Sequence, residues 1–181
     1  MKRADLGRLL AEAARLTSHR DYVIVGSLSI LGAVLDPPQE MIGSIDVDLY
    51  PKSDPGRIEE IAEVLGAGSA FHRQTGIYAD PVSPFLPSLP DGWEERLIAL
   101  ALAGGSVAWC LEPHDAAVSK YVRCERRDRA WCRAGLRHGI LSAALLRERL
   151  RQTHAVEPGE IARARRALSD DARRARHRRK T

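Results

Sequence analysis

The residues that decide the fold are Val23-Ile24-Val25-Gly26-Ser27 and, further along, Ser44-Ile45-Asp46-Val47-Asp48-Leu49-Tyr50. The first stretch is a run of β-branched apolar residues that ends at a glycine, which predicts a buried strand and a turn into a helix. The second stretch alternates small or acidic residues with apolar ones, the period of a strand with one apolar face. We therefore expect two packed strands, the second with Asp46 and Asp48 on one face.

The pair Asp46 and Asp48 predicts a metal site. Their positions are about 6–7 Å apart along one face of a strand. Carboxylates held this close repel each other, and burying them without a partner is costly. A divalent cation removes both penalties, and Mg²⁺ or Mn²⁺ prefers oxygen ligands. Many such pairs simply lie on solvated strands, but the apolar neighbours Ile45, Val47 and Leu49 favour a packed one.

Gly26 and Ser27 are placed where the first strand passes into a helix. Glycine lets the backbone approach a ligand closely, and the serine hydroxyl and the free N–H groups of a helix start can hold phosphate oxygens. A simple tight turn would explain the same two residues. Nucleoside triphosphate chemistry needs a phosphate cradle beside a metal, so the carboxylate pair on the next strand favours the functional interpretation.

The rest of the pattern predicts an α/β half followed by an α half. The expected elements are helices over 4–17, 28–35, 57–65, 113–137, 141–153 and 158–168, and strands over 21–25, 44–50, 76–80, 96–103 and 106–111. This order divides the chain into a catalytic core over 1–112, a helical region over 113–168 that completes the site, and a flexible basic tail over 169–181.

Composition excludes several classes of protein. Apolar residues make up 44% of the 181 residues, enough to bury a core, so the chain as a whole is not disordered. Charges interrupt every apolar run before it could cross a bilayer, so we expect no membrane association. The three cysteines have neither paired nor zinc-like spacing, which indicates reduced thiols in a cytoplasmic protein.

The net charge of +4 is unevenly distributed. Residues 147–181 contain 12 Lys and Arg against 5 Asp and Glu, whereas residues 1–146 contain 16 against 19. A basic end of this kind can hold nucleic-acid phosphates by a charge attraction that weakens with salt. A solvated helical end would have the same composition.

The ordered succession of motifs resembles the nucleotidyltransferase superfamily of the polymerase-β type. More narrowly, the chain resembles the DUF6036 and AbiEii/MenT-like nucleotidyltransferases associated with toxin–antitoxin systems. Besides the two strand segments, the resemblance rests on Phe71-His72, Gly76–Asp80, Leu89–Trp93 and Leu111–Lys120, and covers about residues 20–137.

The resemblance implies a polymerase-β-like core with a mixed sheet and transfer of a nucleoside monophosphate from an NTP to an acceptor hydroxyl. In the related toxins the acceptor is the 3′ end of tRNA, and a cognate antitoxin protein is an implied further partner. Ser27 and Ser44 would then line the triphosphate site beside the Mg²⁺. Lys120 matches a lysine that reaches the phosphates, and Asp128 matches an aspartate eight residues after it.

The chain departs from the family pattern in two places. Between Ser27 and Asp46 lie 18 residues, more than is usual in the superfamily. The related families carry Arg-x-Lys-Asp, whereas here Glu125 replaces the arginine and Arg127 the lysine, which leaves the triphosphate contacts open.

Helical geometry gives one test of the cationic residues. If a single helix spans 113–137, Lys120 and Arg127 fall within about 20° of each other around its axis. Both side chains can then point at one anionic ligand, which assigns Arg127 to the triphosphate site. Without the motifs upstream, a solvated charged helix face would explain these residues equally well.

The third carboxylate of the site is left open. Polymerase-like sites often use an additional acid as the base that deprotonates the attacking hydroxyl. Asp80, at the end of a strand, and Asp128 are the two candidates, and Asp80 is also a candidate metal ligand. Asp80 could equally cap the turn into Pro81.

His114 lies beside Pro113 at a predicted helix start. Its position is best explained by capping or packing there.

The motifs predict a Mg²⁺-dependent nucleotidyltransferase, and the family resemblance implies that it acts on the tRNA 3′ end as the toxin of a type IV toxin–antitoxin system. One alternative keeps the chemistry but adenylylates a protein, as antitoxin-type nucleotidyltransferases do. The other is a catalytically silent module that binds RNA or a partner protein.

Overall fold

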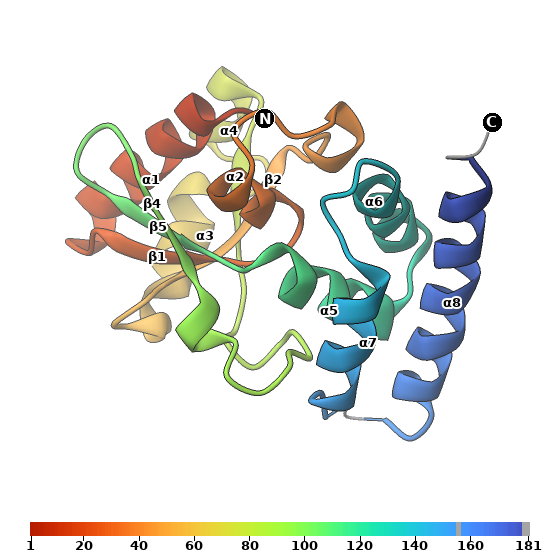
Figure 1. Cartoon of the computed structure of the whole chain (residues 1–181). Helices are drawn as coiled ribbons and strands as arrows, with labels where there is room; N and C mark the ends of the chain where they lie inside the picture. Colours follow the sequence, from red (N-terminus) through yellow and green to blue (C-terminus); the bar gives the residue numbers. More distant parts are fainter. Residues whose placement is uncertain (155–156, 179–181) are drawn as a thin grey trace.

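A computed structural model describes residues 1–154 and 157–178 and shows a five-stranded mixed sheet followed by four helices (Figure 1). The strands are β1 (Asp21–Ile24), β2 (Asp46–Pro51), β3 (Tyr78–Pro81), β4 (Ile98–Ala101) and β5 (Val107–Cys110). They pair in the order β3-β2-β1-β5-β4. The predicted α/β fold with a mixed sheet is confirmed.

The register of the strands positions the site. Strand β1 is antiparallel to β2 and parallel to β5, so it forms the centre of the sheet. Strands β2 and β3 are parallel, with Asp48 paired to Asp80. Residues paired across neighbouring strands share a face of the sheet. This pairing therefore adds a third carboxylate to the face that carries Asp46 and Asp48.

Four helices accompany the sheet: α1 (Arg3–Thr17), α2 (Ile30–Ala33), α3 (Ile58–Leu65) and α4 (Ala70–Thr75). Helix α1 buries Leu6, Leu9, Leu10 and Ala13 completely, the amphipathic spacing that the sequence predicted. Helix α3 packs on β3 and α1, and α2 packs on β4 and β5. Gly32 lets α2 lie close to the sheet, because a Cβ there would be 2.6 Å from the Cβ of Cys110.

The C-terminal helices are α5 (Pro113–Arg123), α6 (Arg126–Arg137), α7 (Ala143–Arg151) and α8 (Glu160–Arg178). Helix α5 contacts the other three. The prediction of one helix over 113–137 is wrong, because Cys124 adopts a left-handed conformation with φ 61° and ends α5. A new helix begins at Arg126.

The chain after residue 158 is also more ordered than predicted. The sequence places the last helix over 158–168 and a flexible tail over 169–181, but α8 continues to Arg178; residues 179–181 lie outside the described part. Ala164, Leu168, Asp171 and Ala172 recur at helical spacing and are at most 5% exposed, so α8 has a buried face that stabilises it. In the described part of the chain, no helix combines the length and apolar character needed to span a membrane.

Candidate active site

Three carboxylates converge at β2 and β3. Asp46, Asp48 and Asp80 each offer an oxygen atom, and these atoms all lie within 4.8 Å of one another. Asp80 is exposed, while Asp46 and Asp48 are partly buried. Of the two candidates for the third carboxylate, Asp80 lies in this cluster and Asp128 does not. We call these three residues the acidic triad.

The electrostatics of the acidic triad leave it short of positive charge. Burial raises the pKa of Asp48 to about 6, and repulsion from Asp46 adds to this shift more than Lys120 offsets it. Burial and Asp46 also raise the pKa of Asp80. Oxygen ligands that repel one another are the donor set that a hard divalent cation neutralises. The residues present therefore fit a Mg²⁺ or Mn²⁺ site.

Gly26 is required by the carboxylate beside it. Its backbone has φ 66° and ψ −154°, a region that only glycine adopts without strain. A Cβ at this position would overlap the side chain of Asp48. The next strand is held at the same point, because the Val25 amide donates to the Asp48 carbonyl at 3.0 Å. Glycine thus lets the β1 turn contact the acidic triad directly.

The two serines have different partners. Ser27 begins a short 3-10 helix (Ser27–Ser29), and its Oγ accepts a hydrogen bond from Lys120 Nζ at 3.0 Å. Ser44 Oγ donates to Asp46 Oδ1 at 2.5 Å. Ser27 therefore meets the cation that faces the triad, whereas Ser44 orients one of the carboxylates. Ser27 and Ser44 line one cavity together with Asp46.

Lys120 belongs to a buried network with Asp128. Its side chain is 4% exposed, and Nζ lies 3.3 Å from Asp128 Oδ1. Asp128 also accepts two hydrogen bonds from Arg123, at 2.7 and 2.8 Å. Burial alone would raise the pKa of Asp128, but the hydrogen bonds from Arg123 and the charge of Lys120 outweigh it and lower the pKa. Asp128 is thus an ionised partner that fixes two cations.

The sequence did not single out Arg123. Its guanidinium is 58% exposed even though Asp128 holds it, and it lines the same cavity as Lys120 and Asp48. Positions three apart on a helix lie on neighbouring parts of its surface. The spacing between Lys120 and Arg123 was therefore a signal that could have identified it.

Arg127 does not share a helix face with Lys120 as predicted, because the break at Cys124 places the two residues on different helices. Arg127 is exposed and faces a different cavity, which it shares with Ser27, Ser44 and Asp46. The cationic residues of the helical region are therefore divided between two sides of the acidic triad.

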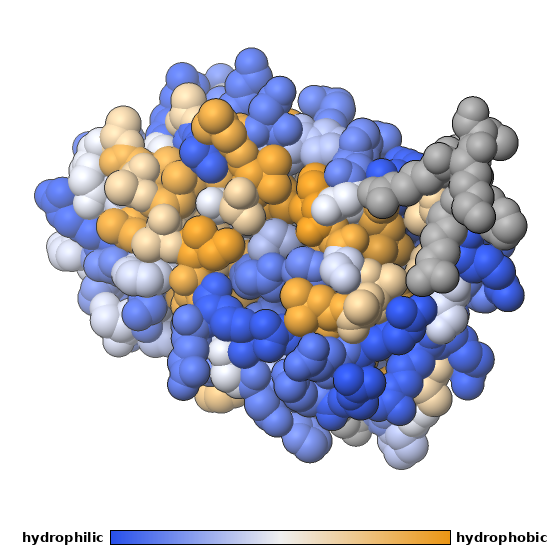
Figure 2. Space-filling view, viewed as in Figure 1, coloured by the Kyte–Doolittle hydropathy of each residue, from blue (hydrophilic) through white to orange (hydrophobic). Residues whose placement is uncertain are grey.

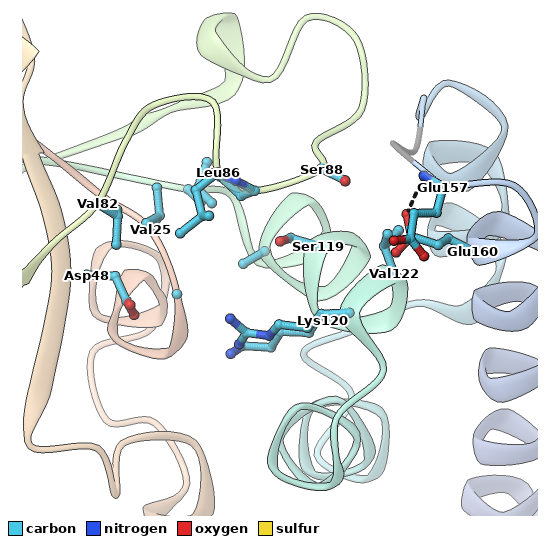
Figure 3. Close-up of a pocket in the computed structure, with 15 residues that line it drawn as sticks. Val25, Asp48, Val82, Leu86, Ser88, Ser119, Lys120, Val122, Glu157 and Glu160 are labelled. Atoms are coloured by element: carbon cyan, nitrogen blue, oxygen red, sulfur yellow. Dashed lines mark hydrogen bonds between the residues drawn. The ribbon is translucent and has the colours of Figure 1, made fainter.

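Two cavities flank the triad. In Figure 3, Asp48 and Lys120 face the first cavity from opposite sides. This cavity has a volume of about 330 Å³ and mainly apolar walls, formed by Val25, Val82, Leu86, Pro87, Leu111, Ala116 and Val122. The second has a volume of about 300 Å³ and lies between Asp46 and α6, where Arg127, Ala130 and Trp131 line it.

The histidine near the start of α5 has a packing role. His114 Nδ1 lies 2.7 Å from Glu112 Oε1, and its Nε2 accepts a hydrogen bond from the Ser142 amide at 2.9 Å. It therefore joins the start of α5 to the start of α7, and both ring nitrogens are engaged. This agrees with the capping or packing role expected from the sequence.

A mixed sheet thus presents a glycine–serine turn, three clustered carboxylates and a buried lysine at one site. The family described as "Nucleotidyltransferase of unknown function (DUF6036)" matches residues 4–175. The chain belongs to this family and is an NTP-dependent transferase, as the sequence predicted. No curated protein and no solved structure matches the chain significantly.

Proposed function

We propose that the chain transfers a nucleoside monophosphate from an NTP to the 3′ end of a tRNA, with Mg²⁺ held by Asp46, Asp48 and Asp80. The observation that supports this most strongly is the placement of the acidic triad beside Lys120, a buried cation hydrogen-bonded to Ser27. Metal ligands and a phosphate-binding cation on either side of one space are what phosphoryl transfer needs.

Polar side chains would bind the phosphates of the NTP, and apolar side chains its base and sugar. Ser27 and Lys120 would hold its phosphate oxygens, and Arg123 would add a second cation from the exposed side of α5. The apolar walls of the first cavity suit the base and sugar of the nucleotide. When bound, Mg²⁺ would polarise the α-phosphate and neutralise charge on the departing pyrophosphate.

In the transfer step, the 3′-hydroxyl oxygen of the acceptor forms a bond to the α-phosphorus. The bond from that phosphorus to the oxygen bridging the α- and β-phosphates breaks, and pyrophosphate leaves. The hydroxyl proton passes to Asp80, the exposed member of the triad. Lys120 compensates the negative charge that accumulates on the pyrophosphate.

The test is incorporation of label from each of four α-³²P-labelled NTPs into total RNA with Mg²⁺. We expect labelling of tRNA by the native chain and none by Asp46→Asn, which keeps the shape and the Ser44 contact but loses a metal ligand. Equal labelling by the variant would overturn the mechanism. Label on a protein instead of RNA would show that the chain adenylylates a protein. Absence of NTP binding with Mg²⁺ would show that the chain is a catalytically silent binding module.

The proposed cellular role is that of the toxin in a type IV toxin–antitoxin system, acting on tRNA in the cytoplasm. Expression of the native chain should then arrest growth, and Asp46→Asn expressed at the same level should not. Growth arrest by both forms would separate toxicity from transfer and overturn this role.

A further inference from the structure

Helix α6 carries a line of arginines that leads away from the acidic triad. Arg127, Ala130, Arg133 and Arg137 lie within a sector of about 120° around the helix axis, at 100° per residue. Arg127 and Ala130 are exposed, and Arg133 and Arg137 are partly exposed. The rise of 1.5 Å per residue places Arg137 about 15 Å from Arg127.

Each end of this line opens into a cavity. Arg127 and Ala130 line the cavity beside Asp46. Arg133 and Arg137 line another, of about 320 Å³, between α6 and α8, to which α8 contributes Arg174. Helices α6 and α8 pack side by side (Figure 1). We call Arg127, Arg133, Arg137 and Arg174 the arginine track.

A buried carboxylate holds the two helices together beneath the arginine track. Asp171 on α8 has a fully buried side chain and accepts two hydrogen bonds from Arg129, at 3.2 and 2.7 Å. Arg133 lies 3.8 Å from the same carboxylate. Arg129 donates hydrogen bonds to both oxygens of Asp171. Arg133 is therefore attracted to this carboxylate by charge but forms no hydrogen bond with it.

The arginine track has an excess of positive charge. Within the described residues, neither Arg127 nor Arg174 forms an ion pair with a carboxylate. Arg137 pairs with Glu40 at 3.0 Å, but both side chains are solvent-accessible, and pairs of this kind exchange at little cost. Arg127 and Arg174 therefore add positive charge that no carboxylate among the described residues pairs with.

We propose that the arginine track binds the phosphates of the single-stranded 3′ segment of a nucleic-acid acceptor and leads its terminal hydroxyl through the second cavity to Asp46. The planar guanidinium group matches a phosphate with two parallel hydrogen bonds, which an ammonium group cannot do. A cavity of about 300 Å³ admits one nucleotide at a time rather than a duplex. The proposal rests on the proposed function and adds the route of the acceptor to it.

The test measures binding without catalysis. A fluorescent 20-nucleotide single-stranded RNA is titrated with the native chain, in the absence of NTP, at several salt concentrations. The test variant is Arg133→Gln/Arg137→Gln/Arg174→Gln, which keeps most of each side chain. The control is Arg8→Gln/Arg15→Gln/Arg73→Gln, which removes the same charge from exposed positions on α1 and α4.

Each phosphate contact to a single strand contributes about 0.7 to the slope of log K against log salt. We therefore expect the test variant to lower that slope by about 2 and to weaken binding about 100-fold at 0.1 M salt. The control should change affinity by much less. If the test variant fails to fold, Arg174→Gln alone, which breaks no ion pair, should weaken binding about fivefold.

Equal losses in the two triple variants would show that only net charge matters and would overturn the proposal. So would tighter binding of a poly-glutamate peptide of equal charge, which would assign the track to an acidic protein. The two proposals fail separately. Loss of transfer with track-dependent RNA binding refutes the function alone, whereas native transfer to RNA by the test variant, with an unchanged KM for RNA, refutes the track alone.

Discussion

The sheet half of the chain, residues 1–112, and the helical half, residues 113–178, bring opposite charges to one site. All three carboxylates of the acidic triad come from β2 and β3, while Lys120, Arg123 and Arg127 come from α5 and α6. On the face drawn in Figure 2, apolar patches lie over the sheet and α2 and also over the helical half near α6 and α7, with hydrophilic residues between and below them. The site is therefore complete only where the two halves pack together. A substitution in one half can remove the charges of that half and leave those of the other half in place.

Removal of a carboxylate from the sheet half should have the largest effect. We expect Asp48→Asn to reduce the transfer rate by about 10³-fold or more, because a bound metal contributes several kcal/mol of transition-state stabilisation. Chelation of the metal should reduce the native rate equally. The control is Asp91→Asn, an exposed carboxylate of the same half, which should stay within about twofold. A comparable loss in the control would remove the distinction between the triad and ordinary surface acids.

Breaking the network of the helical half should reduce stability rather than remove a metal ligand. We expect Asp128→Asn to lower the free energy of unfolding by about 3 kcal/mol, since it leaves Lys120 buried without its partner. Asp170→Asn breaks an exposed pair with Arg173 and should cost less than about 1 kcal/mol. Urea denaturation measures both, and equal losses would show that Asp128 contributes no more than a surface charge.

The pH dependence of stability should reveal the raised pKa of Asp48 in the acidic triad. The pKa of Asp48 is raised from 3.8 to about 6 in the folded chain, so between these values the unfolded state loses its proton first. Without metal, the melting temperature should fall as pH rises through this window. Asp48→Asn should flatten that trend, and Mg²⁺ should stabilise the native chain above pH 6 more than at pH 5. A native profile that matches the variant's would contradict the raised pKa.

The smallest expected effect lies at the junction of α5 and α6. Cys124 has φ 61°, which costs a non-glycine residue about 1 kcal/mol, so Cys124→Gly should stabilise the chain by up to that amount. Gly76, with φ 74° and no atom within 4 Å of the Cβ that alanine would add, gives the reverse comparison. Gly76→Ala should destabilise by a similar amount, and changes of the same sign in both variants would exclude backbone strain as the cause.

The sheet half was largely predictable from local sequence. The β-branched run before Gly26 and the period of two around Asp46 and Asp48 each identify a strand without knowledge of the rest of the fold. The position of Asp80 beside Asp48 depends on how β2 and β3 pair, which no local pattern states. Asp80 therefore stayed one of two candidates until the register was known.

The helical half was harder to predict, for two physical reasons. The break at Cys124 has no proline or glycine to mark it, and the surrounding residues fit a continuous helix, so the predicted helix face shared by Lys120 and Arg127 was wrong. The length of α8 was underestimated because its composition is highly charged. Only the spacing of its few apolar residues, such as Ala164 and Leu168, indicates that one face is buried.

The central position of β1 also has a consequence for the growing chain on the ribosome. Its parallel neighbour lies far along the sequence, since Asp21 pairs with Val107, and contacts of such separation form late. Strands β1, β2 and β3 emerge earlier, and they already contain every member of the acidic triad. Until α5 has been synthesised, the nascent chain therefore contains all three carboxylates of the acidic triad but not Lys120, the buried cation of the site.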